Sequence, residues 1–386
     1  MPATDYQASF LGRISLRRNQ VIAMDGNHEQ EDLELFSKHV SERFTELLSP
    51  PDDVVFDTLL SISWLRKLLD VFLCCEAEFK AVLMMGDDDH PFQISKPPLD
   101  RLIHEFLDRS IKALDLCNAV TNGLDSVRHY QKLAEIAASA LGQKPIGDGQ
   151  ARRSRKALNS LLMAMSVDDK ECSAVKTTER SWSFSRLAVN KDRSPGHLRQ
   201  VAKKWSAAKQ IQAMTWNLVP PRGAEGSGLA SPVYTMSVIM VFVMWALAAA
   251  IPCQERNGLS ATYFPVRKQW SWDQSITGLH EKIAEEWKEK EKKGAAGLLS
   301  EVQKMEKLVR NLMEFTDSFQ FHGGTDEKAE EAADHAAELA EICKRMEEGL
   351  LPLQMKIKEV FHRIVRSRAE FLQALKQGGK SSAPPV

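Results

Sequence analysis

The feature that most constrains the fold is an uncharged stretch, residues 231–254, which reads SPVYTMSVIMVFVMWALAAAIPCQ. Pro232 is placed to begin a helix and Pro252 to end one, because proline is tolerated in the first turn of a helix but not in its interior. The helix between them would be about 30 Å long, which matches the hydrocarbon core of a bilayer. The stretch therefore favours a single membrane-spanning helix. The alternative is the buried central helix of a bundle, which is also apolar on all sides.

The charge and cysteine content exclude several classes of protein. The chain has 386 residues with 51 basic and 52 acidic side chains, so no overall positive field points to nucleic acid. The six cysteines lack CxxC or Cys/His ligand spacing, which favours buried reduced thiols over disulfides or zinc. The N-terminus lacks the apolar core of a secretory signal. We therefore expect a single-pass membrane location, a cytosolic location or both.

Apolar residues recur every three or four positions on both sides of the uncharged stretch, and this spacing predicts amphipathic helices. The expected fold is therefore all-α, an elongated multi-helix bundle with one strongly apolar helix that is a candidate membrane span. Gly, Pro and charge runs divide the chain into a flexible N-terminal tail (1–24), an N-terminal helical bundle segment (25–145), a basic linker with short helices (146–230), the apolar helix (231–254), an aromatic linker (255–273), a C-terminal helical segment (274–378) and a disordered tail (379–386).

The segment before the apolar stretch is locally basic. Residues 150–230 hold 15 Lys or Arg against 6 Asp or Glu, a local excess of +9. This excess predicts contact with anionic lipid or with an acidic partner surface. Within it, Trp182 and Phe184 alternate with serines between Arg180 and Arg186, a pattern typical of an exposed docking linker. Phosphorylation of these serines would offset the positive charge, and an unmodified linker remains the alternative.

Aromatic residues gather just after the apolar stretch. Tyr263, Trp270 and Trp272 lie close to Arg267 and Lys268. This mixture of rings and cations suits a membrane interface or a partner surface. A loop packed on the bundle is the alternative.

No catalytic motif occurs in the chain. We find no hydrolase elbow, phosphate-binding loop, dinucleotide fingerprint, kinase set or HExxH pair. His280 and His362 fall on ordinary helical faces, and the carboxylate pairs Glu285-Glu286 and Glu347-Glu348 lie on mixed-charge surfaces. The sequence therefore predicts no catalytic residues, no cofactor-binding residues and no metal ligands, and the chain is not expected to be an enzyme.

Three motifs resemble a known family. They are FLGRIS (10–15) followed by RRNQV (17–21), RSWSF (180–184), and PVYTM (232–236) continuing through FVMWAL (242–247) to AIPCQ (250–254). They are similar to the plant ROH/BYPASS family, and the likeness is greater to the ROH branch. The resemblance implies a non-enzymatic protein, and it carries no catalytic or ligand residues over to this chain.

The resemblance also implies a partner and a process. ROH-type proteins bind an Exo-seventy-type subunit of the exocyst and act in polarised secretion, including the deposition of seed-coat mucilage and cell-wall material. The alternative is a BYPASS-like membrane protein that restrains a root-derived developmental signal. We expect the chain to contact a membrane through residues 231–254, and we do not expect it to bind nucleic acid. The sequence leaves the oligomeric state undetermined.

Overall fold

A computed structural model gives the fold of the chain. It describes residues 26–48, 58–83, 97–143, 146–167, 205–221, 228–253, 259, 270–291, 297–322 and 326–380. Over these residues the regular elements are helices and no strand occurs, so the predicted all-α class is confirmed. The predicted N-terminal tail and the Arg180–Arg186 motif lie outside the described residues, as do most of the aromatic linker and most of the C-terminal tail.

The helices follow the predicted periodicity closely. They are α2 (Gly26–Leu48), α3 (Ile62–Leu83), α4 (Leu99–Leu141), α5 (Asp148–Val167), α7 (Ala207–Thr215), α8 (Ala230–Ala250), α9 (Asp273–Glu291), α10 (Ser300–His322) and α11 (Asp326–Lys380). Thus α5 and α7 are the described helices of the segment predicted as a basic linker, and α5 packs against α4 and α10. The other segment boundaries remain a prediction.

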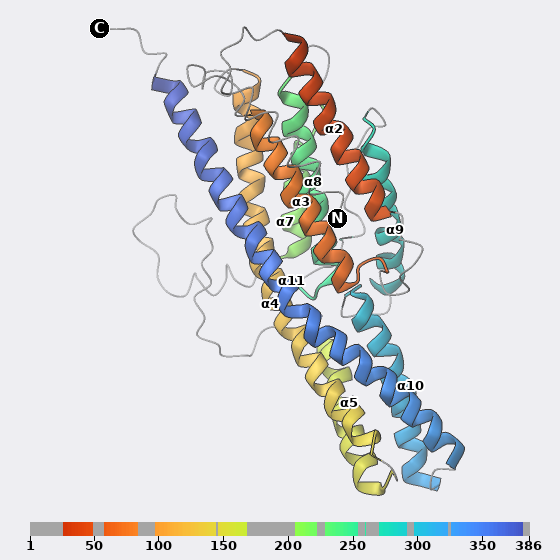
Figure 1. Cartoon of the computed structure of the whole chain (residues 1–386). Helices are drawn as coiled ribbons and strands as arrows, with labels where there is room; N and C mark the ends of the chain where they lie inside the picture. The colour runs from red at the N-terminus through yellow and green to blue at the C-terminus, as the bar shows by residue number, and fades with distance from the viewer. Residues whose placement is uncertain are drawn as a thin grey trace, which may run out of the picture.

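Two long helices, α4 and α11, hold the elongated molecule together along its length (Figure 1). They are antiparallel, because Arg128 of α4 bonds Gln354 of α11 at 2.7 Å while Arg368 bonds the carbonyl oxygen of Leu107. At one end α5 and α10 pack beside them. At the other end lie α2, α3, α7, α8 and α9. Figure 1 shows α11 changing direction along its length. The helix contains Pro352 near its middle, and a proline inside a helix removes a backbone hydrogen bond and so permits a bend.

The uncharged helix α8 is enclosed by the rest of the fold. It packs against α2, α3, α4, α7 and α9, and its most apolar 18-residue window is entirely buried. Phe242, Val243 and Trp245 each have no exposed surface. By length and composition α8 is a candidate span, but this is weak evidence, because the core helix of a soluble protein meets the same test. Of the two arrangements left open by the sequence, the structure has the buried central helix.

The C-terminal end of α8 is bonded into the fold by backbone groups. The carbonyl oxygens of Ala249 and Ala250 accept hydrogen bonds from the N–H groups of Leu298 and Leu299, each at 3.0 Å. These are carbonyls that a helix end leaves without an intrahelical partner, so the segment leading into α10 satisfies them. Immediately after α8, the carbonyl oxygen of Pro252 lies so close to α4 that a Cβ built on Gly123 would be 1.9 Å from it. The helix end is therefore fixed in place from two directions.

The described part of the aromatic linker packs on the bundle. Trp270 and Trp272 stack with ring centroids 5.7 Å apart, and the ring of Tyr234 of α8 lies 5.1 Å from that of Trp270. Trp272 has no exposed surface. Trp270 and Trp272 therefore match the alternative of a loop packed on the bundle. Tyr263 lies outside the described residues.

Candidate functional site

Two buried glutamates on α3 are the most unusual polar groups of the described core. Glu76 has a relative exposure of 3% and Glu78 of 0%. Residues two positions apart on a helix point about 200° away from each other, so the two carboxylates face opposite sides of α3. Glu78 faces α2 and Glu76 faces α11. Because an unpaired buried carboxylate is costly, each needs a partner from the helix it faces.

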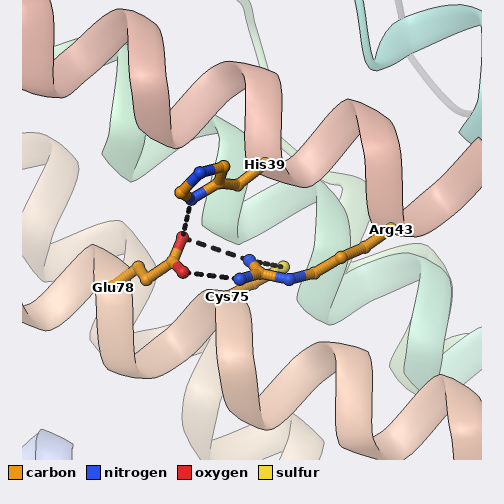
Figure 2. Close-up of polar contacts among 4 residues, drawn as sticks. All are labelled: His39, Arg43, Cys75 and Glu78. Carbon is orange, nitrogen blue, oxygen red and sulfur yellow. Dashed lines mark hydrogen bonds and ion pairs between the residues drawn. The ribbon is translucent and has the colours of Figure 1, made fainter. Parts of the chain in front are cut away.

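Glu78 is held by two side chains of α2 (Figure 2). The guanidinium of Arg43 binds the carboxylate at two points, with Nη2 2.5 Å from Oε1 and Nη1 3.1 Å from Oε2. The Nδ1 atom of His39, one helical turn away, lies 3.2 Å from Oε2. The same Nη1 of Arg43 lies 3.9 Å from the sulfur of Cys75. This two-point pairing of Arg with a carboxylate fixes both the distance and the rotation of α2 relative to α3.

The electrostatics of this cluster favour charged groups at Arg43 and Glu78. Burial alone would raise the pKa of Glu78, but the hydrogen bonds from His39 and Arg43 outweigh it, so the pKa is lowered. Burial likewise disfavours the Arg43 cation, but the hydrogen bond to Glu78 and nearby charges raise its pKa. Burial raises the pKa of Cys75 to about 12, so the thiol stays protonated at neutral pH. The cluster therefore provides an ion pair between helices, and its Cys75 thiol is not an activated nucleophile.

Glu76 belongs to a row of ion pairs between α3 and α11. Its carboxylate accepts hydrogen bonds from Arg363, at 3.1 Å, and from Ser367. On either side, Lys356 pairs with Asp70 and Glu370 pairs with Lys80. The α11 members are spaced seven residues apart and so lie on one flank of the helix. Burial raises the pKa of Glu76 even though Ser367 and Arg363 act in the opposite direction. This row fixes the register of two parallel helices.

A second arrangement presents apolar side chains to solvent. Trp216 and Val219 follow α7, with exposed fractions of 75% and 57%, whereas Leu218 between them is 3% exposed. Arg109 of α4, itself 5% exposed, donates to the carbonyl oxygen of Met214 at 3.0 Å and to that of Trp216 at 3.3 Å. The buried guanidinium thus holds the backbone of this loop while its tryptophan points outward.

The backbone of the loop supports the same presentation. Asn217 has a φ of 58°, in the left-handed region that asparagine tolerates better than most residues. This reversal places neighbouring side chains on opposite sides, so Leu218 enters the core while Trp216 and Val219 stay outside. Rigidly presented tryptophans are enriched among the residues that dominate binding energy at protein interfaces. We define residues 216–219, which follow α7, as the Trp216 loop.

The residues singled out from the sequence are scattered over the structure. His280 packs beneath Trp245 with ring centroids 4.3 Å apart, and burial lowers its pKa to about 4. His362 and the pairs Glu285-Glu286 and Glu347-Glu348 are exposed. Over the described part of the chain, no group of three His, Cys, Asp or Glu side chains is placed to hold a metal ion.

Sequence analysis missed the buried ion pairs and the Trp216 loop. The sequence does carry a signal for the buried ion pairs, because Glu76 and Glu78 interrupt the apolar residues of α3. Two positions that are two residues apart point to opposite sides of a helix, so on a half-buried helix only one of them can face solvent. Arg43, the partner of Glu78, lies 35 residues away in sequence, and Arg363, the partner of Glu76, lies 287 residues away. No local sequence pattern therefore identifies these partners. The Trp216 loop depends on Arg109, which lies 107 residues before Trp216.

The geometry defines a class of elongated helical protein. Buried ion pairs join its helices, and a loop held by a buried arginine presents exposed apolar residues. Comparison with known proteins gives the family. The chain matches the Protein ROH1-like family over residues 1–375, and it belongs to that family. It is 57% identical to Protein ROH1A of Arabidopsis thaliana over the full length of both chains. It is 40% identical to Protein ROH1D of the same plant, over 97% of this chain and 98% of that one.

A more distant relative extends the similarity beyond Arabidopsis. UPF0496 protein 4 of Oryza sativa subsp. japonica is 22% identical over 71% of this chain and 55% of its own length. No solved structure matches the chain. The recognition of a ROH-type protein from its three motifs is therefore confirmed at the level of the family.

Proposed function

We propose that this protein is a non-enzymatic helical adaptor that binds an Exo-seventy-type subunit of the exocyst and thereby modulates polarised secretion, such as the deposition of mucilage or cell-wall material. Full-length similarity to Protein ROH1A supports an ROH-type role. The observation that carries the proposal is the Trp216 loop, because it presents a large apolar side chain without needing to be ordered first. Binding then costs less conformational entropy than it would for a flexible loop.

Trp216→Ala tests the proposed contact. In a binding titration between the full chain and purified Exo-seventy-type subunits, we expect this change to weaken affinity at least tenfold, as for a central interface tryptophan. Met163→Ala is the matched control, because Met163 is 66% exposed on α5, and it should leave affinity unchanged. Both variants should unfold like the unmodified protein, since both side chains are exposed.

The two levels of the proposal fail differently. If the unmodified chain binds no Exo-seventy-type subunit, the adaptor function is wrong. If it binds and Trp216→Ala binds equally well, the function stands and the Trp216 loop is not the contact.

We further infer that α8 remains in the core and that any membrane contact is peripheral, through the basic residues between 150 and 230. Removing α8 into a bilayer would expose the apolar faces of α3, α4 and α9 and would break its bonds with Leu298 and Leu299. The BYPASS-like membrane alternative requires that removal. Extraction of plant membranes with alkaline carbonate should release the protein, and retention in the pellet would favour the spanning alternative.

A further inference from the structure

Near its middle, the outward face of α11 carries two exposed apolar residues that the fold does not use. Leu351 and Met355 are 59% and 58% exposed, and they lie one turn apart on the same side of the helix. Leu353 between them has no exposed surface and points into the core. Residue 353 is also the midpoint of α11, which runs from Asp326 to Lys380. The apolar pair therefore marks the centre of the solvent-facing side of the longest described helix.

The exposed charges on α11 differ in sign on the two sides of that centre. Before Leu351, seven exposed carboxylates face two exposed lysines; the carboxylates are Glu330, Glu331, Asp334, Glu338, Glu341, Glu347 and Glu348, and the lysines are Lys328 and Lys344. After Met355, three exposed basic side chains, Lys358, Arg366 and Lys376, outnumber the one exposed carboxylate, Glu359. The outward face is thus acidic in its first half, apolar at its centre and basic in its second half.

We propose that two copies of this chain associate through the outward faces of α11, with the helices antiparallel about a twofold axis at Leu351 and Met355. A twofold contact uses the same surface on both copies and must therefore be self-complementary. In the antiparallel orientation, Leu351 of one copy meets Met355 of the other, and each acidic half lies along a basic half. A parallel pair would place the two acidic halves side by side, and like-charge repulsion would destabilise that dimer.

Charge also selects a second copy over an anionic membrane as the occupant of this face. The acidic half of α11 would be repelled by anionic lipid, whereas it is attracted to the basic half of another α11. The contact has only two large apolar residues at its centre and is otherwise made by exposed charged side chains, so it lacks the extensive apolar core of an obligate dimer. We therefore expect a weak, concentration-dependent dimer rather than a permanent one.

Sedimentation equilibrium of the full chain over a range of concentrations tests the association. We expect a monomer–dimer equilibrium that Met355→Glu weakens at least tenfold, because each dimer would then bury two carboxylates at its apolar centre. Met163→Glu changes a methionine on α5 that is 66% exposed, against 58% for Met355, and should leave the equilibrium unchanged. A chain that stays monomeric at its highest soluble concentration, or a dimer that Met163→Glu weakens as much as Met355→Glu, would overturn the proposal.

A charge exchange tests the antiparallel orientation. Glu341 and Arg366 are both exposed and lie at nearly equal distances on opposite sides of the centre, so each would face the other across the twofold axis. Glu341→Lys alone and Arg366→Glu alone should each weaken the dimer on the order of fivefold, as expected for two exposed ion pairs lost per dimer. The double variant should regain most of the affinity. If the double variant is weaker than either single one, the antiparallel orientation is wrong. If the chain dimerises only together with an Exo-seventy-type subunit, the self-association is wrong while the adaptor function stands.

Discussion

Replacement of Leu247 by alanine distinguishes a core helix from a membrane span quantitatively. Leu247 lies in α8 with no exposed surface. In a packed core, Leu→Ala removes buried methyl groups and leaves a cavity, at a cost of about 2–5 kcal/mol. In a helix that faces lipid, the same change alters only the insertion energy, because leucine contributes roughly 0.3–0.6 kcal/mol on insertion scales. The two environments therefore differ severalfold in the expected loss of stability.

Urea unfolding in buffer without detergent measures this loss. With a denaturant slope of about 3 kcal/mol per M, a loss of 3 kcal/mol lowers the unfolding midpoint by about 1 M. Met163→Ala is the control, because its side chain is 66% exposed on α5 and surface changes stay within about 0.5 kcal/mol. An unmodified protein that requires detergent, or a Leu247→Ala midpoint equal to that of the control, would refute the reasoning.

Val243→Arg is a harsher version of the same test. Val243 has no exposed surface near the middle of α8. A guanidinium there would be buried without a partner, at a cost of roughly 3–5 kcal/mol in addition to the lost packing. This total approaches the whole stability of an ordinary domain, about 5–15 kcal/mol. We therefore expect loss of cooperative unfolding or aggregation, where a membrane span would instead leave the flanking bundle folded.

The remaining predictions concern the buried ion pairs and one close approach. Arg43→Met should cost about 3–5 kcal/mol in urea unfolding because it leaves Glu78 buried beside only part of its partners, and the double change Arg43→Met with Glu78→Leu should restore much of the loss. The folded-state pKa of Glu78 is lowered, so the ionised carboxylate stabilises the fold. This stabilisation is fully present above about pH 4.3, the usual pKa of an unfolded glutamate, and declines as the pH falls further. The urea unfolding midpoint of Glu78→Gln should not show this decline with pH. Gly123→Ala should lower the melting temperature, since its Cβ would lie 1.9 Å from the carbonyl oxygen of Pro252, whereas Gly149→Ala has open space and should raise it slightly.

The sequence by itself determined the helices of this protein. The 3.6-residue periodicity predicted amphipathic helices and an all-α fold, and the uncharged stretch between Pro232 and Pro252 predicted the helix that the structure shows as α8. These signals are local, because a helix bonds its backbone within itself and shows its buried face in the order of its residues. The family likewise followed from local motifs.

Only the tertiary structure decided what surrounds each helix. A helix that is apolar on all sides meets the same requirement in lipid and in a protein core, so the sequence of α8 could not select its environment. Glu76 and Glu78 were visible as polar residues in an apolar segment, but their partners come from α11 and α2, and Arg109 reaches Trp216 across 107 residues. Pairing between distant segments depends on how the helices pack in space, and spacing along the chain carries no record of that packing.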